Sequence, residues 1–185
     1  KPSEVTPRFA KPFLATLERV PEMAAALQYV AGDGALGAAL IEQVDAVCFT
    51  GSVATCRKVA EAAARAFIPA FLELGGKDPA IVTASADLDT AAAGIASGAL
   101  GNAGQVCVSI ERVYVDKAVA AEFVNKVVAK AKGHKLAYPT LADGTMGPII
   151  QEAQAHVINR HLDDAVTRGA QILCGGRVTQ RDGGW

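Results

Sequence analysis

The chain has 185 residues, of which 51% are hydrophobic and 20% are charged, so it is long enough to bury a core of its own. The chain has 18 lysine and arginine residues and 19 aspartate and glutamate residues. It therefore has no excess of positive charge with which to bind nucleic acid or an anionic membrane. No apolar stretch approaches the roughly 20 residues that span a bilayer, and no signal peptide is recognisable, so we expect a cytoplasmic protein.

The first 74 residues alternate between helical and strand patterns. Pro7 suits the first position of a helix, which Pro12 is then expected to kink or interrupt. The apolar run 46–50, bounded by Gly51, predicts a buried parallel strand, and Ser52 is expected to cap the helix that follows. In chain order the expected elements are a helix over 7–20, a short strand within 27–34 that runs into a glycine-rich turn, a helix over 35–43, a strand over 46–50, a helix over 53–67 and a strand over 68–74.

The remaining residues continue this alternation. They predict an extended segment over 77–83, an alanine-rich helix from Asp87 to the loop of Cys107, a strand over 111–116, helices over 117–133 and 151–169, and a strand over 170–176. Alternating strands and helices predict an α/β fold with a parallel sheet of the doubly wound type. The double glycine at 75 and 76 indicates a domain boundary, which divides the chain into 1–74 and 75–185.

Two glycine-containing turns are candidates for binding phosphate. The strand end at Gly51 and the helix start at Ser52 present free N–H groups and the positive end of a helix dipole, the usual place for a pyrophosphate. The alternative is that Ser52 is only a helix cap. The segment GDGALG, which contains Gly34, matches the pattern GxGxxG. Because Asp33 would place a negative charge where phosphate binds, the alternative is that these glycines only shape the turn.

One carboxylate and one thiol are the candidate catalytic groups of the chain. Glu73 and Cys107 lie in glycine-flanked loops, 34 positions apart in the sequence. A cysteine in an open turn is a candidate nucleophile when it is a thiolate, and a glutamate with room to move is a candidate base that acts through water. The alternatives are a solvated charge at a strand end for Glu73 and a small buried hydrophobe for Cys107.

The other cysteines and the three histidines indicate no second site. Cys48 lies inside an apolar strand and is expected to be buried, while Cys56 and Cys174 are expected to be structural. The sequence has no CxxC pair and no histidine at metal-ligand spacing, so we expect no metal site.

Four short motifs follow one another along the chain: KPSE at 1–4, FTGS at 49–52, ELGGK at 73–77 and GQVC at 104–107. Together they make the sequence similar to the NAD(P)-dependent aldehyde dehydrogenase superfamily over essentially its whole length. The resemblance implies oxidation of an aldehyde to an acid through a thiohemiacetal and a thioester on Cys107, with Glu73 activating the water that hydrolyses the thioester. It also implies the second half of an NAD-binding domain over 1–74, the first part of a catalytic domain over 75–185, and a homo-oligomer, either a dimer or a tetramer.

The same resemblance implies a set of cofactor contacts. Lys1 and Glu4 would contact the adenosine ribose, and because the carboxylate of Glu4 would repel a 2′-phosphate, NAD is expected, with NADP as the alternative. Ser52 would contact the pyrophosphate, whereas Lys77 is expected to serve structure. The full set of expected cofactor-binding residues is Lys1, Ser3, Glu4, Gly34, Gly51, Ser52, Leu74 and Gly75.

The sequence departs from the family pattern in several places. Val53 and Cys56 stand where the family often has threonine and glycine. The family's upstream asparagine, an oxyanion donor, and its downstream glutamate, a nicotinamide-ribose contact, have no counterpart in these residues, so we expect an internal segment that is inactive alone. Two other functions stay open: a CoA-acylating relative, against which Glu73 argues because CoA would replace water, and a catalytically silent binding or structural protein.

Overall fold

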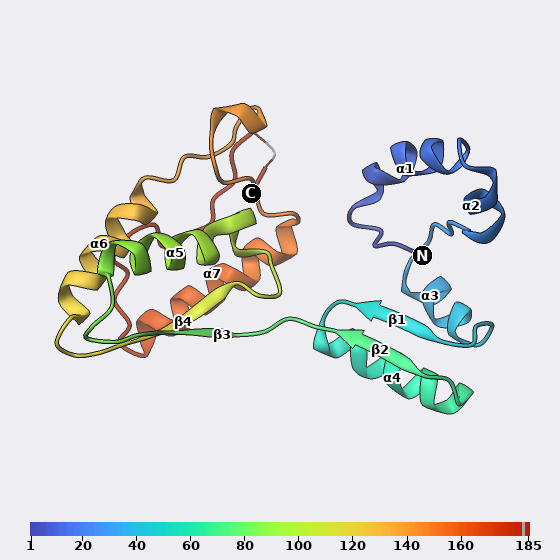
Figure 1. The fold of residues 1–185 in the computed structure, drawn as a ribbon, viewed down its shortest axis with the longest axis horizontal. Helices are drawn as coiled ribbons and strands as arrows, with labels where there is room; N and C mark the ends of the chain where they lie inside the picture. Colours follow the sequence, from blue (N-terminus) through green and yellow to red (C-terminus); the bar gives the residue numbers. More distant parts are fainter. Residues whose placement is uncertain (183) are drawn as a thin grey trace. The chain divides into compact units, whose positions relative to one another are not determined.

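The computed structural model describes residues 1–182 and 184–185. The chain divides into two compact units, Lys1–Leu74 and Gly75–Trp185. Figure 1 shows helices and parallel strands in both units.

Helices dominate the beginning of the first unit. A 3-10 turn, η1, follows Thr6 and has Pro7 at its first position, as expected from the sequence. The elements of the unit are η1 (Pro7–Phe9), α1 (Ala10–Leu17), α2 (Pro21–Ala26), α3 (Gly34–Ile41), β1 (Val47–Thr50), α4 (Val53–Ala66) and β2 (Ala70–Glu73).

Two expectations for this region are wrong. Pro12 does not interrupt the helix: it is the third residue of α1, within the first turn, where a backbone N–H has no acceptor inside the helix and proline therefore removes nothing. Within the described part of the chain, 27–33 form no strand, although the backbone at Leu27 is extended. A strand needs a hydrogen-bonded neighbour, and β1 pairs with β2 instead.

The strands β1 and β2 form a parallel pair in which Val47 lies opposite Ala70 and Thr50 opposite Glu73. Helix α4 packs against both strands, and Figure 1 shows it along one face of the pair. Val47 and Phe49 are half-buried, while Cys48 is exposed beside Phe71 on the open face. The expectation of a buried Cys48 is therefore wrong, because successive side chains of a strand point to opposite faces and this sheet is covered on one face only.

Helix α4 is built as predicted. The Ser52 hydroxyl caps it by accepting a hydrogen bond from the Thr55 N–H at 3.2 Å. Its buried residues, Cys56 and Ala63, are seven positions apart and therefore share one face of the helix. The burial of Cys56 agrees with the structural role expected for it.

The second unit repeats the strand and helix alternation. Its elements are β3 (Asp78–Val82), α5 (Leu88–Leu100), η2 (Gly101–Gly104), β4 (Ile110–Val115), α6 (Ala120–Lys132), η3 (Leu141–Asp143) and α7 (Glu152–Thr167). Strands β3 and β4 pair in parallel, and α5 connects them. The α/β class predicted from the sequence is thereby confirmed in both units.

A hydrophobic core forms where α5 and α6 pack together beside the β3–β4 pair. Its buried members are Val82, Ala92, Ile95 and Phe123. Ile110, the first residue of β4, packs against this cluster and so fixes the beginning of that strand.

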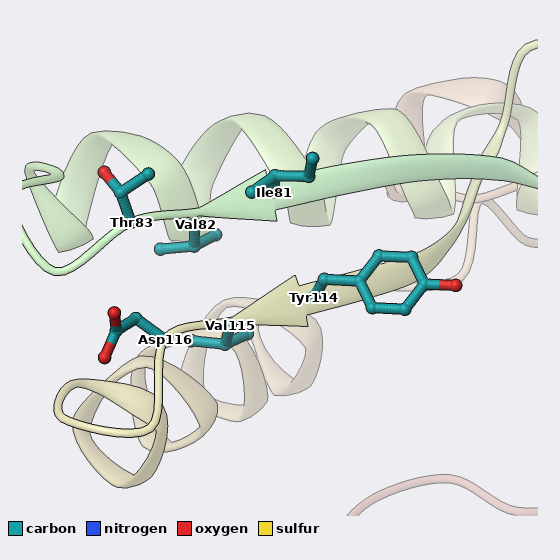
Figure 2. Close-up of a pocket in the computed structure, with 6 residues that line it drawn as sticks. All are labelled: Ile81, Val82, Thr83, Tyr114, Val115 and Asp116. Carbon is teal, nitrogen blue, oxygen red and sulfur yellow. The ribbon is translucent and has the colours of Figure 1, made fainter.

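The other face of the β3–β4 pair is open. Ile81 is 77% exposed and its cross-strand neighbour Tyr114 is 57% exposed. A shallow pocket of about 280 Å³ lies at the carboxyl ends of the two strands, and Figure 2 shows Thr83 and Asp116 directly after the arrowheads. The predicted catalytic loop precedes β4, so this pocket lies at the opposite end of the strand from Cys107.

The last expected strand is also wrong. In the described residues, 170–176 pair with no other strand. Gly169, Gly175 and Gly176 have φ angles of 92°, 66° and 105°, which place turns at both ends of the segment instead of extended backbone. Cys174 within it is half-buried.

None of the described helices combines the length and apolar character needed to cross a membrane.

Candidate active site

Cys107 lies on an exposed turn between η2 and β4. The turn is closed by a hydrogen bond from the Ser109 N–H to the Val106 carbonyl at 3.1 Å. Val106 and Val108, on either side of the cysteine, are 40% and 66% exposed. The structure thus presents the thiol to solvent, contrary to the alternative in which Cys107 is a buried hydrophobe.

Ser109 holds the carboxyl side of this turn. It is only 2% exposed, and its hydroxyl lies 3.3 Å from the Gly98 carbonyl and 3.2 Å from the Ala99 carbonyl, to which it donates. These carbonyls belong to the last turn of α5, where helix carbonyls lack partners inside the helix. The motifs of the sequence do not reveal Ser109; its only signal is a lone hydroxyl in an apolar run, which needs a partner when buried.

The amino side of the turn has an unusual backbone. Asn102, Ala103 and Gly104 have consecutive φ angles of 51°, 57° and 74°. This left-handed conformation costs roughly 1–2 kcal/mol per non-glycine residue. It ends α5 sharply and directs the chain into the Cys107 turn, and the Asn102 side chain supports the bend by donating to the Gln105 carbonyl at 3.1 Å.

The segment around Gly76 lies against the Cys107 turn. A Cβ atom on Gly76 would come within 3.1 Å of the Cys107 carbonyl oxygen, closer than nearly all real contacts of this kind. Arg112 donates two hydrogen bonds to the Lys77 carbonyl, at 3.0 and 2.8 Å. The Lys77 ammonium pairs with Glu111 at 2.6 Å, which agrees with the structural role expected for Lys77.

In the first unit, Gly51, Ser52 and Glu73 come together at the carboxyl ends of β1 and β2. The Gly51 N–H donates to the Glu73 carbonyl at 3.1 Å, and Ser52 begins the helix α4 immediately afterwards. The Glu73 side chain is exposed at this edge. Ligands of open α/β sheets bind outside the carboxyl ends of the strands, so this edge is suited to a cofactor.

A second cluster in the first unit joins the chain start to the GDG turn. The Lys1 ammonium lies 2.9 Å from Glu4 Oε2, and this hydrogen bond lowers the pKa of Glu4. Ser3 accepts a hydrogen bond from the Val5 N–H at 3.2 Å. Eight residues enclose a pocket of about 310 Å³: Pro2, Ser3, Glu4, Pro7, Tyr29, Ala31, Gly32 and Asp33.

Asp33 itself caps α3. Its carboxylate accepts hydrogen bonds from Ala35 N–H at 3.0 Å and Leu36 N–H at 3.2 Å. A negative side chain therefore already occupies the helix N-terminus where a phosphate would bind. This arrangement favours the interpretation that the glycines of GDGALG shape the turn, and a cofactor contact at Gly34 stays a prediction.

Glu73 and Leu74 close the first unit, whereas Gly75 and Cys107 belong to the second. Each half therefore contributes one of the two predicted catalytic groups. In the part of the chain that the structure describes, no group of three or more His, Cys, Asp or Glu side chains is placed to hold a metal ion.

Comparison with known proteins defines the family. The model of the aldehyde dehydrogenase family matches residues 1–185, so the chain belongs to that family. The solved structure of a provisionally named aldehyde dehydrogenase, PutA from Anabaena variabilis, is 56% identical and superposes with a TM-score of 0.97 over 100% of this chain and 39% of its own.

Two other relatives are more distant. An NAD-dependent aldehyde dehydrogenase from Sinorhizobium meliloti is 36% identical, with a TM-score of 0.80 over 84% of this chain and 32% of its own. A provisionally named NADP(+) succinate-semialdehyde dehydrogenase from Mycolicibacterium smegmatis is 44% identical over 80% of this chain and 29% of its own. The chain thus spans about a third of the length of these relatives.

Proposed function

We propose that the intact protein containing this chain oxidises an aldehyde to a carboxylic acid with NAD, or alternatively NADP, and that Cys107 is its nucleophile. The observation that carries the proposal is the exposed thiol on a turn fixed by buried Ser109 and by the left-handed bend at 102–104, in a chain of the aldehyde dehydrogenase family. A turn fixed on both sides holds a nucleophile in one attack geometry.

In the first step the Cys107 thiolate attacks the aldehyde carbon. A sulfur–carbon bond forms, and the carbonyl electron pair moves to oxygen to give an oxyanion. Among the described residues, the Cys107 N–H has no hydrogen-bond acceptor, so it is available to donate to that oxyanion. One such donor typically contributes about 10² to 10³ in rate.

The residues of the first unit fit a dinucleotide. The N-terminus of α4 at Ser52, directly after Gly51, suits the pyrophosphate, because it presents N–H groups at the carboxyl end of a parallel sheet. The exposed Glu4 carboxylate, beside the pocket at the GDG turn, suits the hydroxyls of a ribose. When bound, the nicotinamide would accept the hydride that leaves the thiohemiacetal carbon and so leave a thioester on Cys107.

Glu73 is proposed as the base of the second step. Its carboxylate takes a proton from water while the water oxygen bonds to the thioester carbon. The carbon–sulfur bond then breaks, the acid leaves, and the thiolate is restored. The exposure of Glu73 supports this role, because an exposed carboxylate can reach a water molecule.

The carboxylate of Glu4 favours NAD over NADP. The Lys1 contact lowers the pKa of Glu4. A glutamate is negative at neutral pH, and a negative group repels a ribose 2′-phosphate. One relative is named for NADP(+) and another for NAD, so the choice within the family is variable. We further propose that 1–74 belong to the NAD-binding domain and 75–185 to the catalytic domain of a cytoplasmic homo-oligomer.

Replacement of the thiol in the intact protein tests the proposal. Cys107→Ala should abolish NADH formation from an aldehyde while NAD binding, measured by calorimetry, is retained. Cys48→Ala is the matched control, because Cys48 is also exposed but lies on the open face of β1. Retained turnover in Cys107→Ala would refute the nucleophile; turnover that needs CoA would show an acylating enzyme; and cofactor binding without turnover of any aldehyde would indicate a silent scaffold.

A further inference from the structure

Gln105 lies two residues before Cys107, and its side chain makes hydrogen bonds to three backbone groups. Its Nε2 donates to the Asn102 carbonyl at 3.0 Å and to the Pro148 carbonyl at 3.2 Å. Its Oε1 accepts from the Ile150 N–H at 2.8 Å. Both ends of the amide are therefore engaged, and only one orientation of the amide satisfies all three partners.

These bonds connect regions that are far apart in the sequence. Asn102 belongs to the left-handed bend before Cys107, whereas Pro148 and Ile150 lie 43 and 45 residues after Gln105, in the connection that leads to α7. The backbone of Gln105 is also held, because its N–H donates to the Asn102 carbonyl at 3.2 Å. The Gln105 side chain thus ties the start of the Cys107 turn to a second segment of the same unit.

The side chain of Gln105 holds the amino side of the Cys107 turn, and the side chain of Ser109 holds its carboxyl side. Ser109 attaches the turn to the end of α5, and Ile110 attaches β4 to the hydrophobic core. Without the Gln105 side chain, the amino side of the turn would keep only the local bonds between Asn102 and the Gln105 backbone. These bonds would have to hold three left-handed residues, two of which are not glycine and therefore cost free energy.

We propose that Gln105 is a positioning residue, which fixes the Cys107 turn through its amide bonds to Asn102 and to the 148–150 connection and so holds the sulfur in its attack geometry. This inference rests on the proposed function of Cys107. It assigns no contact with the substrate to Gln105. A displacement of a reacting group by about 1 Å can cost on the order of 10²-fold in rate.

Gln105→Met tests the proposal in the intact protein, since methionine has a similar length and lacks the amide. The expected result is a fall in kcat on the order of 10²-fold, with KM for NAD unchanged and a slower alkylation of Cys107 by iodoacetamide. A second variant, Ile150→Pro, removes the N–H that donates to Gln105 Oε1 and leaves Gln105 intact. It should show the same effects in weaker form.

The matched control is Asn159→Leu. Asn159 is also half-buried and joins a distant segment, through bonds of 2.9 Å to both the N–H and the carbonyl of Val178. Loss of these two hydrogen bonds should lower the unfolding midpoint but leave kcat and the alkylation rate of Cys107 unchanged. Only positioning of the sulfur predicts this difference between the two sites.

Three outcomes overturn the positioning role. Folded Gln105→Met and Ile150→Pro variants with wild-type kcat would show that the bonds do not position the nucleophile. Loss of folding in both variants, or an equal fall in kcat for Asn159→Leu, would show that the bonds only hold the fold. If instead Cys107→Ala keeps full turnover, the proposed function itself fails, and this result is distinct from each of the others.

Discussion

The two units of the chain bury their apolar side chains differently. In the second unit, Val82, Ala92, Ile95 and Phe123 form one contiguous cluster. In the first unit the buried residues are spread over three helices, with Leu17 on α1, Ile41 on α3 and two small residues on α4. The second unit is therefore the better packed of the two.

This difference extends to the candidate catalytic groups. Cys107 precedes a strand whose first residue, Ile110, packs on the core, so packing fixes its turn. Glu73 is the last residue of β2, which belongs to a two-stranded sheet. Phe71 on the same strand is 60% exposed. The place of Glu73 depends on backbone hydrogen bonds and on the cap of α4. Changes in the first unit should therefore act mainly on cofactor and water, and changes in the second on folding and on the thiol.

The largest expected effect separates the two catalytic groups. Glu73→Gln in the intact protein should lower steady-state kcat by about 10²- to 10⁴-fold, because the base that activates water is lost. Formation of one NADH per subunit in the first turnover should survive, since the thiol is intact. Rapid-mixing absorbance measures this burst.

Glu61→Gln provides the control for that change. Glu61 is an exposed carboxylate on α4 in the same unit, and its loss should leave kcat unchanged. Absence of the burst in Glu73→Gln would contradict the assignment of the first step to Cys107 and of water activation to Glu73.

The next effect concerns the core of the second unit. Phe123→Ala should lower the free energy of unfolding by about 3–5 kcal/mol, because Phe123 is only 3% exposed and its removal leaves a cavity. Val124→Ala, at the neighbouring and 36% exposed position, should cost about 1 kcal/mol or less. Urea unfolding followed by circular dichroism measures both, and equal losses would contradict the assigned core.

A smaller effect is expected at the cap of α4. Ser52→Ala removes the hydrogen bond to the Thr55 N–H and should cost about 1 kcal/mol of stability. It should also raise KM for NAD, since Ser52 is a proposed pyrophosphate contact. Ser52→Thr keeps a capping hydroxyl and should restore most of both; a loss of stability with unchanged KM would leave Ser52 as a cap only.

The smallest effect is a pH dependence at the cap of α5. The Thr90 N–H donates to Asp87 at 2.7 Å, and this bond lowers the pKa of Asp87 below 3.8. The folded state then binds fewer protons than the unfolded state, so the contribution of Asp87 is present above pH 3.8 and is lost as the pH falls through the folded pKa. Thermal midpoints of wild type and Asp87→Asn should converge in that acid range, and divergence would show the opposite sign.

Elements with strong local signals could be predicted from the sequence. The apolar run ending at Gly51, the cap at Ser52 and the helix expected from Asp87 each placed an element correctly, because a short strand or a helix start is encoded by neighbouring residues. The strands expected within 27–34 and 170–176 failed because pairing depends on a distant partner, which local pattern does not reveal.

The candidate site shows the same limit. The sequence indicated Cys107 and Glu73 through glycine-flanked motifs, and the structure leaves both exposed. It could not indicate Gln105 or Ser109 as supports, because all but one of their partners lie 10 to 45 residues away and depend on the folded path of the chain. Exposure of Cys48 was missed for a related reason, since an apolar strand is buried only where another layer covers it.

The most direct test of the account is to identify the atom that carries the acyl group. The intact protein with Glu73→Gln would be mixed with an aldehyde and NAD, quenched in acid, digested and examined by peptide mass spectrometry. The account predicts one acyl group per subunit, on the peptide that contains Cys107. An acyl group on the exposed Cys48, or on no cysteine although NADH has formed, would contradict it.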